Sequence, residues 1–142
     1  MPEHSPRSTR EQVRAARAHE LITKIKAGTE AHAKEFGRQC LRLPALIHQC
    51  GLCQALAFLE AKKFGPVVHS LALVLSAPEQ DLNKQLDGSA LAKQAREAGM
   101  VEYQWLSREA LKSAQWLKRY TEAILNLKPG DADEDTNTGG GK

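Results

Sequence analysis

The stretch TREQVRAARAHELITKIKAGTEAHAKEFGRQCLRL (residues 9–43) decides the fold class of this chain. When successive residues are placed about 100° apart, its apolar side chains fall on one helical face. That face consists of Ala15, Ala18, Ile22, Ile25, Ala33, Phe36, Cys40 and Leu43. The phase is kept across Gly28, and Ser8–Glu11 and Thr9–Gln12 both match a capping box. We therefore predict one long helix from about residue 9 to about residue 42.

Further helices are predicted downstream of this segment. Pro44 should break or restart the helix, which leaves residues 43–50 as a short second helix and, after Gly51, residues 52–63 as a third. Gly65–Pro66 marks the next stop and start. Residues 67–75 (VVHSLALVL) could form a strand by composition, but no second strand is available to pair with it, so we expect a buried helix.

The C-terminal half is predicted to add two more helical segments. Ser76 and Glu79 have capping-box spacing, so residues 78–98 should be helical, with a break near Asp87–Gly88 and Gly99 as the C-terminal cap. Ser107 should cap the last helix, and Leu106 and Leu111 have the spacing of a hydrophobic staple. The sequence thus predicts an all-α protein, a compact bundle of about six helices with a long N-terminal helix.

Composition sets the domain organisation. With 142 residues, 42% of them hydrophobic, the chain has the size and core of one domain. We expect a flexible N-terminus at residues 1–8, one helical domain at 9–128, and a disordered acidic tail at 129–142, because the tail has no large apolar residue. No apolar run is long enough to span a bilayer, and no secretory signal is present. Three cysteines without a disulfide framework indicate a cytoplasmic protein.

Cys50-Gly-Leu-Cys53, with His48 before it and Cys40 upstream, is the one motif with chemical potential. Two thiolates and an imidazole could hold zinc, and the pair could be redox-active. Cys40 lies on the apolar face, however, and a redox CxxC normally follows a strand in a βαβ unit. We therefore predict no metal and no cofactor. Since nucleophile elbows, phosphate loops and metalloprotease spacings are also missing, we predict that the protein is not an enzyme.

A basic stripe is the stronger functional lead. Arg10, Arg14, Arg17, Lys24 and Arg42 lie together about a quarter-turn from the apolar face of residues 9–43. Such a row can follow a phosphate backbone, or it can be a solvated face paired with Glu11 and Glu20. The body without its tail carries a net charge of +6, which suits a polyanion. Aromatic residues make up only 5% of the chain, so phosphate contact is favoured over base stacking.

Two runs of the sequence resemble a known family. RLPALIHQCGLCQALAFLEAK (residues 42–62) and LSREALKSAQWLKR (residues 106–119) resemble signatures of the small helical subunit of the Cmr complex, the type III-B CRISPR RNA-guided effector. They cover about a quarter of the chain. One departure lies at residues 48–50, where relatives often carry a basic residue and an asparagine, so an RNA contact there is in doubt.

The resemblance implies a non-catalytic structural subunit for antiviral defence. Its expected partners are the repeated backbone subunit, the large polymerase-like subunit, copies of itself, and guide and target RNA, with no membrane. The motif-borne cations expected to contact RNA are Arg38, Arg42, Lys62, Lys118 and Arg119, and periodicity adds Arg14, Arg17 and Lys24. The alternatives are a small thiol or zinc protein that uses His48, Cys50 and Cys53, and a protein-only helical adaptor, including the similar type III-A small subunit.

Overall fold

A computed structural model of the protein describes residues 8–133. Within these residues there is no β-strand, and the prediction of an all-α protein with about six helices is confirmed. The helices are α1 (Arg10–Lys26), α2 (Glu30–Cys50), α3 (Leu52–Ala61), α4 (Gly65–Ser76), α5 (Gly88–Glu97) and α6 (Met100–Ile124), with 3-10 turns η1 (Leu82–Lys84) and η2 (Pro129–Asp133).

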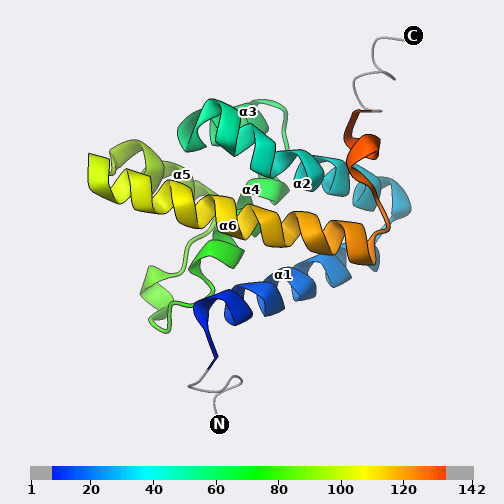
Figure 1. The fold of residues 1–142 in the computed structure, drawn as a ribbon, viewed down its shortest axis with the longest axis horizontal. Coiled ribbons are helices and arrows are strands. Elements are labelled where there is room, and N and C mark those ends of the chain that lie inside the picture. Colours follow the sequence, from blue (N-terminus) through cyan, green and yellow to red (C-terminus); the bar gives the residue numbers. More distant parts are fainter. Residues whose placement is uncertain (1–7, 134–142) are drawn as a thin grey trace.

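Helix α6 runs across the whole bundle, with α1 along one side of it and α2 along the other (Figure 1). Helix α4 lies behind α6 and contacts α1, α2, α3 and α5 as well. Its sequence is apolar on nearly every face, which is the composition of a helix surrounded by neighbours. Leu71 of α4 and Leu106 and Leu117 of α6 are fully buried in the shared core. The expectation that residues 67–75 are a buried helix is therefore confirmed.

The single long N-terminal helix is a wrong prediction. Helix α1 ends at Lys26, and α2 begins at Glu30 after a new cap, in which the Thr29 hydroxyl accepts a hydrogen bond from the His32 backbone N–H at 3.3 Å. The apolar residues of α1 and α2 keep one helical periodicity across the break because both helices pack against α6. The periodicity does not require the two helices to be continuous. The predicted Thr9–Gln12 capping box at the start of α1 is present, with bonds of 2.8 and 3.0 Å.

Pro44 does not break the chain as expected, because it lies inside α2. A proline in a helix interior removes one hydrogen bond and costs about 3 kcal/mol. The neighbouring side chains explain why the helix continues: Leu43 is fully buried and Ile47 nearly so, and both join the main core. Gly51 then ends α2 with φ of +83°, a conformation that glycine adopts without strain. The predicted break at Gly51 is confirmed.

The helix start predicted at Ser76 is wrong. Ser76 is the last residue of α4 and caps no helix, because its hydroxyl donates to the Ala72 carbonyl and accepts from the Leu86 N–H. Residues 78–87 are consequently irregular apart from η1. Helix α5 begins at Gly88, and the Asp87 carboxylate caps it by accepting from the Ala90 N–H at 2.8 Å. The expected break at Asp87–Gly88 is thus the true start of α5.

The last helix begins earlier than predicted. Gly99 is the N-cap of α6 and not the C-cap of the helix before it, and Ser107 lies two turns inside α6. Leu106, expected at a staple, is buried in the core. The first two turns of α6 were not predicted because their apolar residues Met100 and Val101 are exposed and follow no buried stripe.

The chain after α6 folds back over α2. Leu127 is buried against Leu41, and a side chain at Gly37 would displace the Leu127 methyl group, so glycine allows the close approach at that crossing. Pro129–Asp133, the first residues of the predicted tail, form η2 against α2. The rest of the predicted tail, residues 134–142, and residues 1–7 of the predicted flexible N-terminus lie outside the described part of the chain. None of the described helices has the length and hydrophobicity to cross a bilayer.

Candidate functional site

The predicted phosphate-binding cations do not form one stripe. Arg17 and Lys24 lie on α1, Arg38 and Arg42 on α2, and Lys62 caps the C-terminus of α3. Lys118 and Arg119 lie on α6. The fold brings two groups of cations to the flanks of α6, one along its border with α1 and one along its border with α2.

Arg14 is not an exposed member of the stripe, and that expectation is wrong. Its residue surface is only 3% exposed, and its guanidinium lies between α1, α4 and α6. Nη1 donates to the Glu109 carboxylate at 2.6 Å, while Nε and Nη2 both donate to the Leu75 carbonyl at 3.1 and 2.9 Å. Each of the three guanidinium nitrogens thus donates a hydrogen bond to α4 or α6, so Arg14 joins three helices from within.

Glu109 is the carboxylate that makes this buried cation tolerable. Burial alone would raise the pKa of Glu109, but the hydrogen bond and charge of Arg14, with Lys112 at 3.5 Å, outweigh it and hold this pKa below its usual range. The ion pair is therefore charged at neutral pH. Sequence reasoning missed this pair, although Arg14, Ala18 and Ile22 follow one another at four-residue spacing and are the three buried residues of α1.

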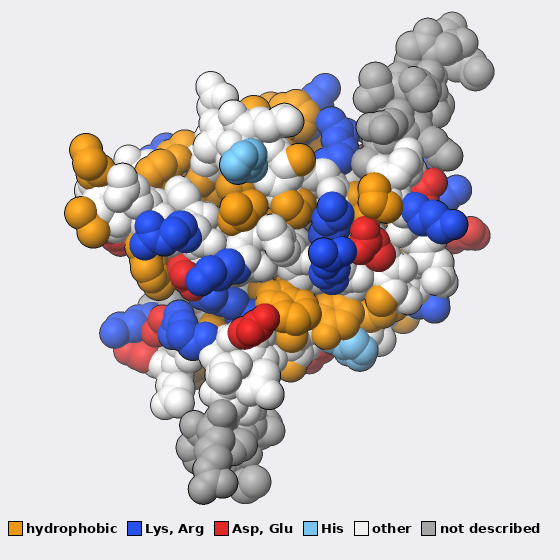
Figure 2. All heavy atoms as spheres, in the orientation of Figure 1, with side chains coloured by type: hydrophobic (Ala, Val, Ile, Leu, Met, Phe, Trp, Pro, Cys, Tyr) orange, Lys and Arg blue, Asp and Glu red, His pale blue; other side chains and the backbone are white. Residues whose placement is uncertain are grey.

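A groove of about 880 Å³ lies above this ion pair, between α1 and α6. The pair forms its floor, and the other lining side chains are charged, amide or indole: Arg10, Glu11, Trp105, Lys112, Gln115, Trp116 and Arg119. No aliphatic side chain lines it. Figure 2 shows this face of the molecule, with hydrophobic side chains near its centre and Lys and Arg side chains around them.

Aromatic side chains gather at this groove, contrary to what the low aromatic content indicated. Trp116 stacks on Tyr120, with ring centroids 5.8 Å apart and planes 20° apart. Tyr120 in turn meets His19 of α1 edge-on at 5.2 Å. Trp105 is 38% exposed at the other end of the groove. The signal was present in the sequence, because spacings of 11 and 4 residues place Trp105, Trp116 and Tyr120 on one helical face.

The cations at the rim of the groove are held loosely. Arg10 is 3.9 Å from Glu79, Lys112 is 3.5 Å from Glu109, and Arg119 is 3.4 Å from Glu122. More than half of each of these three cationic side chains is exposed to solvent. Exposed ion pairs of this kind contribute about 0–1 kcal/mol, so an incoming anion can displace the carboxylates at little cost.

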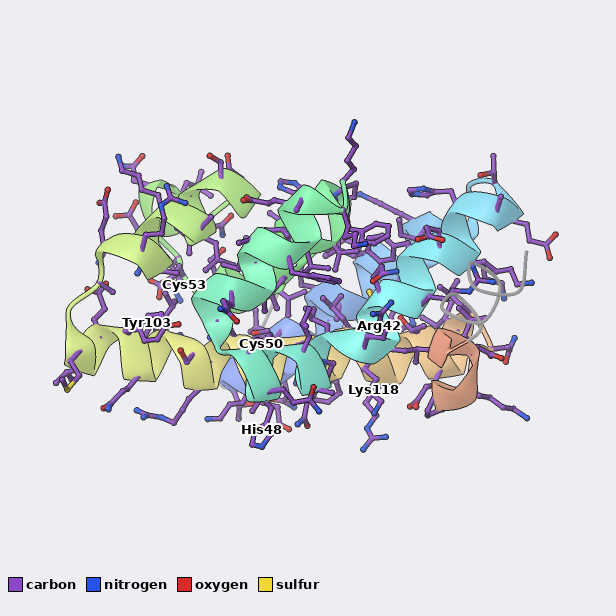
Figure 3. All side chains as sticks on the ribbon, turned by 90° about the horizontal axis from the view of Figure 1, so that it is seen from above. Arg42, His48, Cys50, Cys53, Tyr103 and Lys118 are labelled. Carbon is purple, nitrogen blue, oxygen red and sulfur yellow. The ribbon has the colours of Figure 1, made fainter. Side chains whose placement is uncertain are left out.

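On the opposite flank of α6, Arg42 and Lys118 lie at the same position along the long axis of the bundle (Figure 3). They come from α2 and α6, which pack directly against each other. Both residues are half-buried. Arg38 lies one turn before Arg42 on α2 and forms an ion pair with Glu35 at 3.6 Å. These three residues are the motif-borne cations that the fold brings together.

The remaining predicted cations lie apart from these two groups. Arg17 and Lys24 both pair with Glu20 on the surface of α1, at 3.7 and 3.9 Å. Lys62 lies over the Phe58 ring, with 5.8 Å from Nζ to the ring centroid. The pairing with Glu20 is the solvated-face arrangement that the sequence left open for Arg17 and Lys24.

The cysteine motif lies at the junction of α2 and α3. Cys50 is exposed and Cys53 half-buried, and the Cys53 backbone N–H donates to the Tyr103 hydroxyl at 3.0 Å. Figure 3 shows His48 pointing outward, away from Cys53. Cys40 is in the core, where burial raises its thiol pKa to about 12. In residues 8–133 no three His, Cys, Asp or Glu side chains are grouped as a metal site would require.

Known proteins match this chain over its helical part. A family model described as "CRISPR-associated protein (Cas_Cmr5)" matches residues 10–124, from the start of α1 to the end of α6. The "CRISPR system Cmr subunit Cmr5" of Thermus thermophilus is 38% identical over 120 residues, which are 82% of this chain and 96% of the relative. The crystal structure of a CRISPR-associated Cmr5 family protein, also from Thermus thermophilus, superposes with a TM-score of 0.71 at 35% identity, covering 82% of this chain and 97% of the other.

Proposed function

The chain belongs to the Cmr5 family of CRISPR-associated proteins, and from this membership we propose that it is a non-catalytic structural subunit of a type III-B (Cmr) RNA-guided effector complex. In the cytoplasm, copies of it stack along the repeated backbone subunit, contact the large polymerase-like subunit, and help to hold guide and target RNA. The observation that carries the proposal is the family match, which covers all six described helices.

An assembly role fits the surface at the start of α6. Met100 and Val101 are 77% and 79% exposed there, although side chains of this kind are usually buried. Exposed apolar side chains that lie next to each other are typical of protein contact surfaces. We expect this end of α6 to face a neighbouring subunit of the complex.

Co-expression with the other Cmr subunits and a guide RNA tests the assembly role. A tag on this chain should recover the backbone subunit together with guide RNA, and Met100→Ser with Val101→Ser should lower that recovery severalfold. Lys93→Ala with Arg96→Ala, two exposed cations on α5, is the matched control. Recovery of this chain alone, with every subunit expressed and soluble, would refute the assembly role.

Contact with RNA is the finer part of the proposal, and Arg42, Lys118 and Arg119 are its best-placed residues. All three lie in the two matched sequence blocks. Arg42 and Lys118 come from α2 and α6, which pack against each other, while Arg119 lies on the α1 flank of α6. Arg38, Arg17, Lys24 and Lys62 are secondary candidates, and Arg14 is excluded by its burial. Cations in a row bind phosphates without reading sequence. Since each copy offers few cations, useful affinity requires copies aligned in the complex.

Alanine at both Arg42 and Lys118 tests this contact in the assembled complex. If each side chain neutralises one phosphate, target-RNA affinity at about 0.1 M salt should fall roughly tenfold or more. Lys93→Ala with Arg96→Ala removes the same charge from α5 and should change affinity little. Equal losses from the two double variants would show that only net charge matters and would reject a defined contact.

A further inference from the structure

We propose that the groove between α1 and α6 binds a short single-stranded stretch of RNA, with its unpaired bases stacked on Trp105 and Trp116 and its phosphates held by Lys112, Arg119 and Arg10. This proposal rests on the proposed function, because it names which RNA the subunit binds and where. It goes beyond phosphate contact on the α2 flank, since the groove adds recognition of bases that are not in a duplex.

The chemistry of the groove wall points to nucleic acid bases. The only apolar side chains that line it are the indoles of Trp105 and Trp116. An anchoring side chain from a protein partner is normally received by a desolvated, well-packed pocket. This groove instead has a charged floor, where Arg14 and Glu109 meet at 2.6 Å. Flat aromatic faces beside cations are the combination that single-strand binders use, with stacking for bases and charge for phosphates.

The charged side chains of the groove also favour single-stranded RNA as its ligand. The groove is lined by four cations and two carboxylates. Glu109 is already neutralised by Arg14 at its floor, so Lys112 at the rim keeps most of its attraction for an anion. Arg119 and Arg10 are 69% and 52% exposed, and their carboxylate partners are 3.4 and 3.9 Å away. A phosphate that enters the rim replaces weak surface ion pairs with charge-assisted hydrogen bonds.

The dimensions indicate a segment longer than one nucleotide. Trp105 and Trp116 are three helical turns apart on α6, or about 16 Å along its axis at roughly 1.5 Å per residue. One base cannot contact both indoles across that distance. A volume of about 880 Å³ is near the upper end of ligand sites, which are roughly 300–1,000 Å³. A run of about two or three unpaired nucleotides fits both observations, with Lys112 between the two stacking positions.

The two indoles also supply the assay. Trp105 and Trp116 are the only tryptophans in the full 142-residue chain, so its tryptophan emission comes from this groove alone. We expect a short oligoadenylate to quench that emission, because bases stacked on indoles do so. A hairpin duplex RNA and inorganic polyphosphate should bind the cations without quenching. The single variants Trp105→Tyr and Trp116→Tyr then assign the signal to each end of the groove.

Affinity variants complete the test. Trp105→Leu should weaken oligoadenylate binding about tenfold, since one stacked base contributes roughly that factor. Trp105→Tyr should keep most of the affinity because a ring remains. Leu82→Ala, at an exposed apolar side chain outside the groove, is the matched control and should have no effect. Trp105 is partly exposed, so its substitution should leave the fold intact.

The outcomes separate this proposal from the proposed function. Oligoadenylate that binds, measured by the anisotropy of a labelled strand, without quenching would overturn the groove proposal and leave phosphate contact standing. Failure to bind at millimolar oligoadenylate would overturn it as well. If Trp105→Leu blocks incorporation into the complex but leaves oligoadenylate affinity unchanged, the groove is a protein interface and the proposal fails. The RNA-contact part of the proposed function fails separately, if Arg42→Ala with Lys118→Ala leaves target binding by the complex unchanged, and its assembly part fails if this chain is recovered alone.

Discussion

On one flank of α6, Arg14 reaches from α1 into the core and is clamped by Glu109 and the Leu75 carbonyl. On the other flank, Arg42 and Lys118 are half-buried where α2 meets α6. Arg14 and Arg42 fall on the same stripe by helical periodicity, yet one is enclosed by the core and the other reaches the surface. The difference arises from the neighbours, because α1 faces a buried carboxylate and a main-chain carbonyl that both accept hydrogen bonds from the Arg14 guanidinium.

The largest effect should come from breaking the buried pair. Arg14→Met leaves Glu109 buried with Lys112 as its remaining partner, and removing one member of a buried ion pair costs about 3–5 kcal/mol in free energy of unfolding. Urea denaturation measures this loss. The double variant Arg14→Met with Glu109→Leu should recover most of it, because the uncompensated charge is then gone. A loss of less than about 1 kcal/mol in the free energy of unfolding of Arg14→Met would contradict a stabilising role for the buried ion pair.

A smaller effect is expected from Glu109→Gln, which keeps the shape but removes the charge. A hydrogen bond to a charged group contributes about 1.5–3 kcal/mol, so the variant should lose an amount in that range at about pH 7. The pKa of Glu109 is lowered in the folded state, so its stabilisation is complete above the unfolded pKa of about 4.3 and is lost as the pH falls through the lower folded value.

Denaturation between about pH 7 and pH 3 checks this sign. The wild-type chain should lose more stability on acidification than Glu109→Gln, so that the two curves converge at low pH. Curves that stay parallel over the whole range would show that Glu109 does not titrate with folding.

The smallest change in stability is expected at Lys112, although it contacts the same carboxylate. Its side chain is 68% exposed and its Nζ lies 3.5 Å from Glu109, so Lys112→Ala should change the free energy of unfolding by about 0.5 kcal/mol or less. The contrast with Arg14 is a within-site control, because both cations share one acid. If Lys112→Ala lowered the free energy of unfolding as much as Arg14→Met, solvent exposure would not distinguish the surface cation from the structural one.

The sequence was most informative where local chemistry decides the structure. The Thr9–Gln12 capping box, Pro66 in the first turn of α4, and the break at Gly51 each depend on a few neighbouring residues, and all were predicted correctly. The break between α1 and α2 was not predicted, although Thr29 is a favourable helix cap, because the periodicity of the apolar residues continues across it. Pro44 was misread because burial of Leu43 and Ile47 offsets the lost hydrogen bond.

The candidate site was predicted only in part. Matched sequence blocks pointed to Arg42, Lys118 and Arg119, and the fold places them on neighbouring helices. The groove was not foreseen because its walls come from α1 and α6, which are about 90 residues apart in the sequence. Composition was misleading for the same reason, since three of the few aromatic residues converge on one helical face.

The most direct test of the account is the salt dependence of target-RNA binding by the Cmr complex that contains this chain. Arg42→Ala and Lys118→Ala should each reduce the slope of log affinity against log salt by about 0.7–0.9, as expected when one phosphate contact is lost. Arg14→Met, measured where the protein remains folded, should leave the slope unchanged. Unchanged slopes for Arg42→Ala and Lys118→Ala, or a reduced slope for Arg14→Met, would contradict the division between phosphate-binding and structural cations.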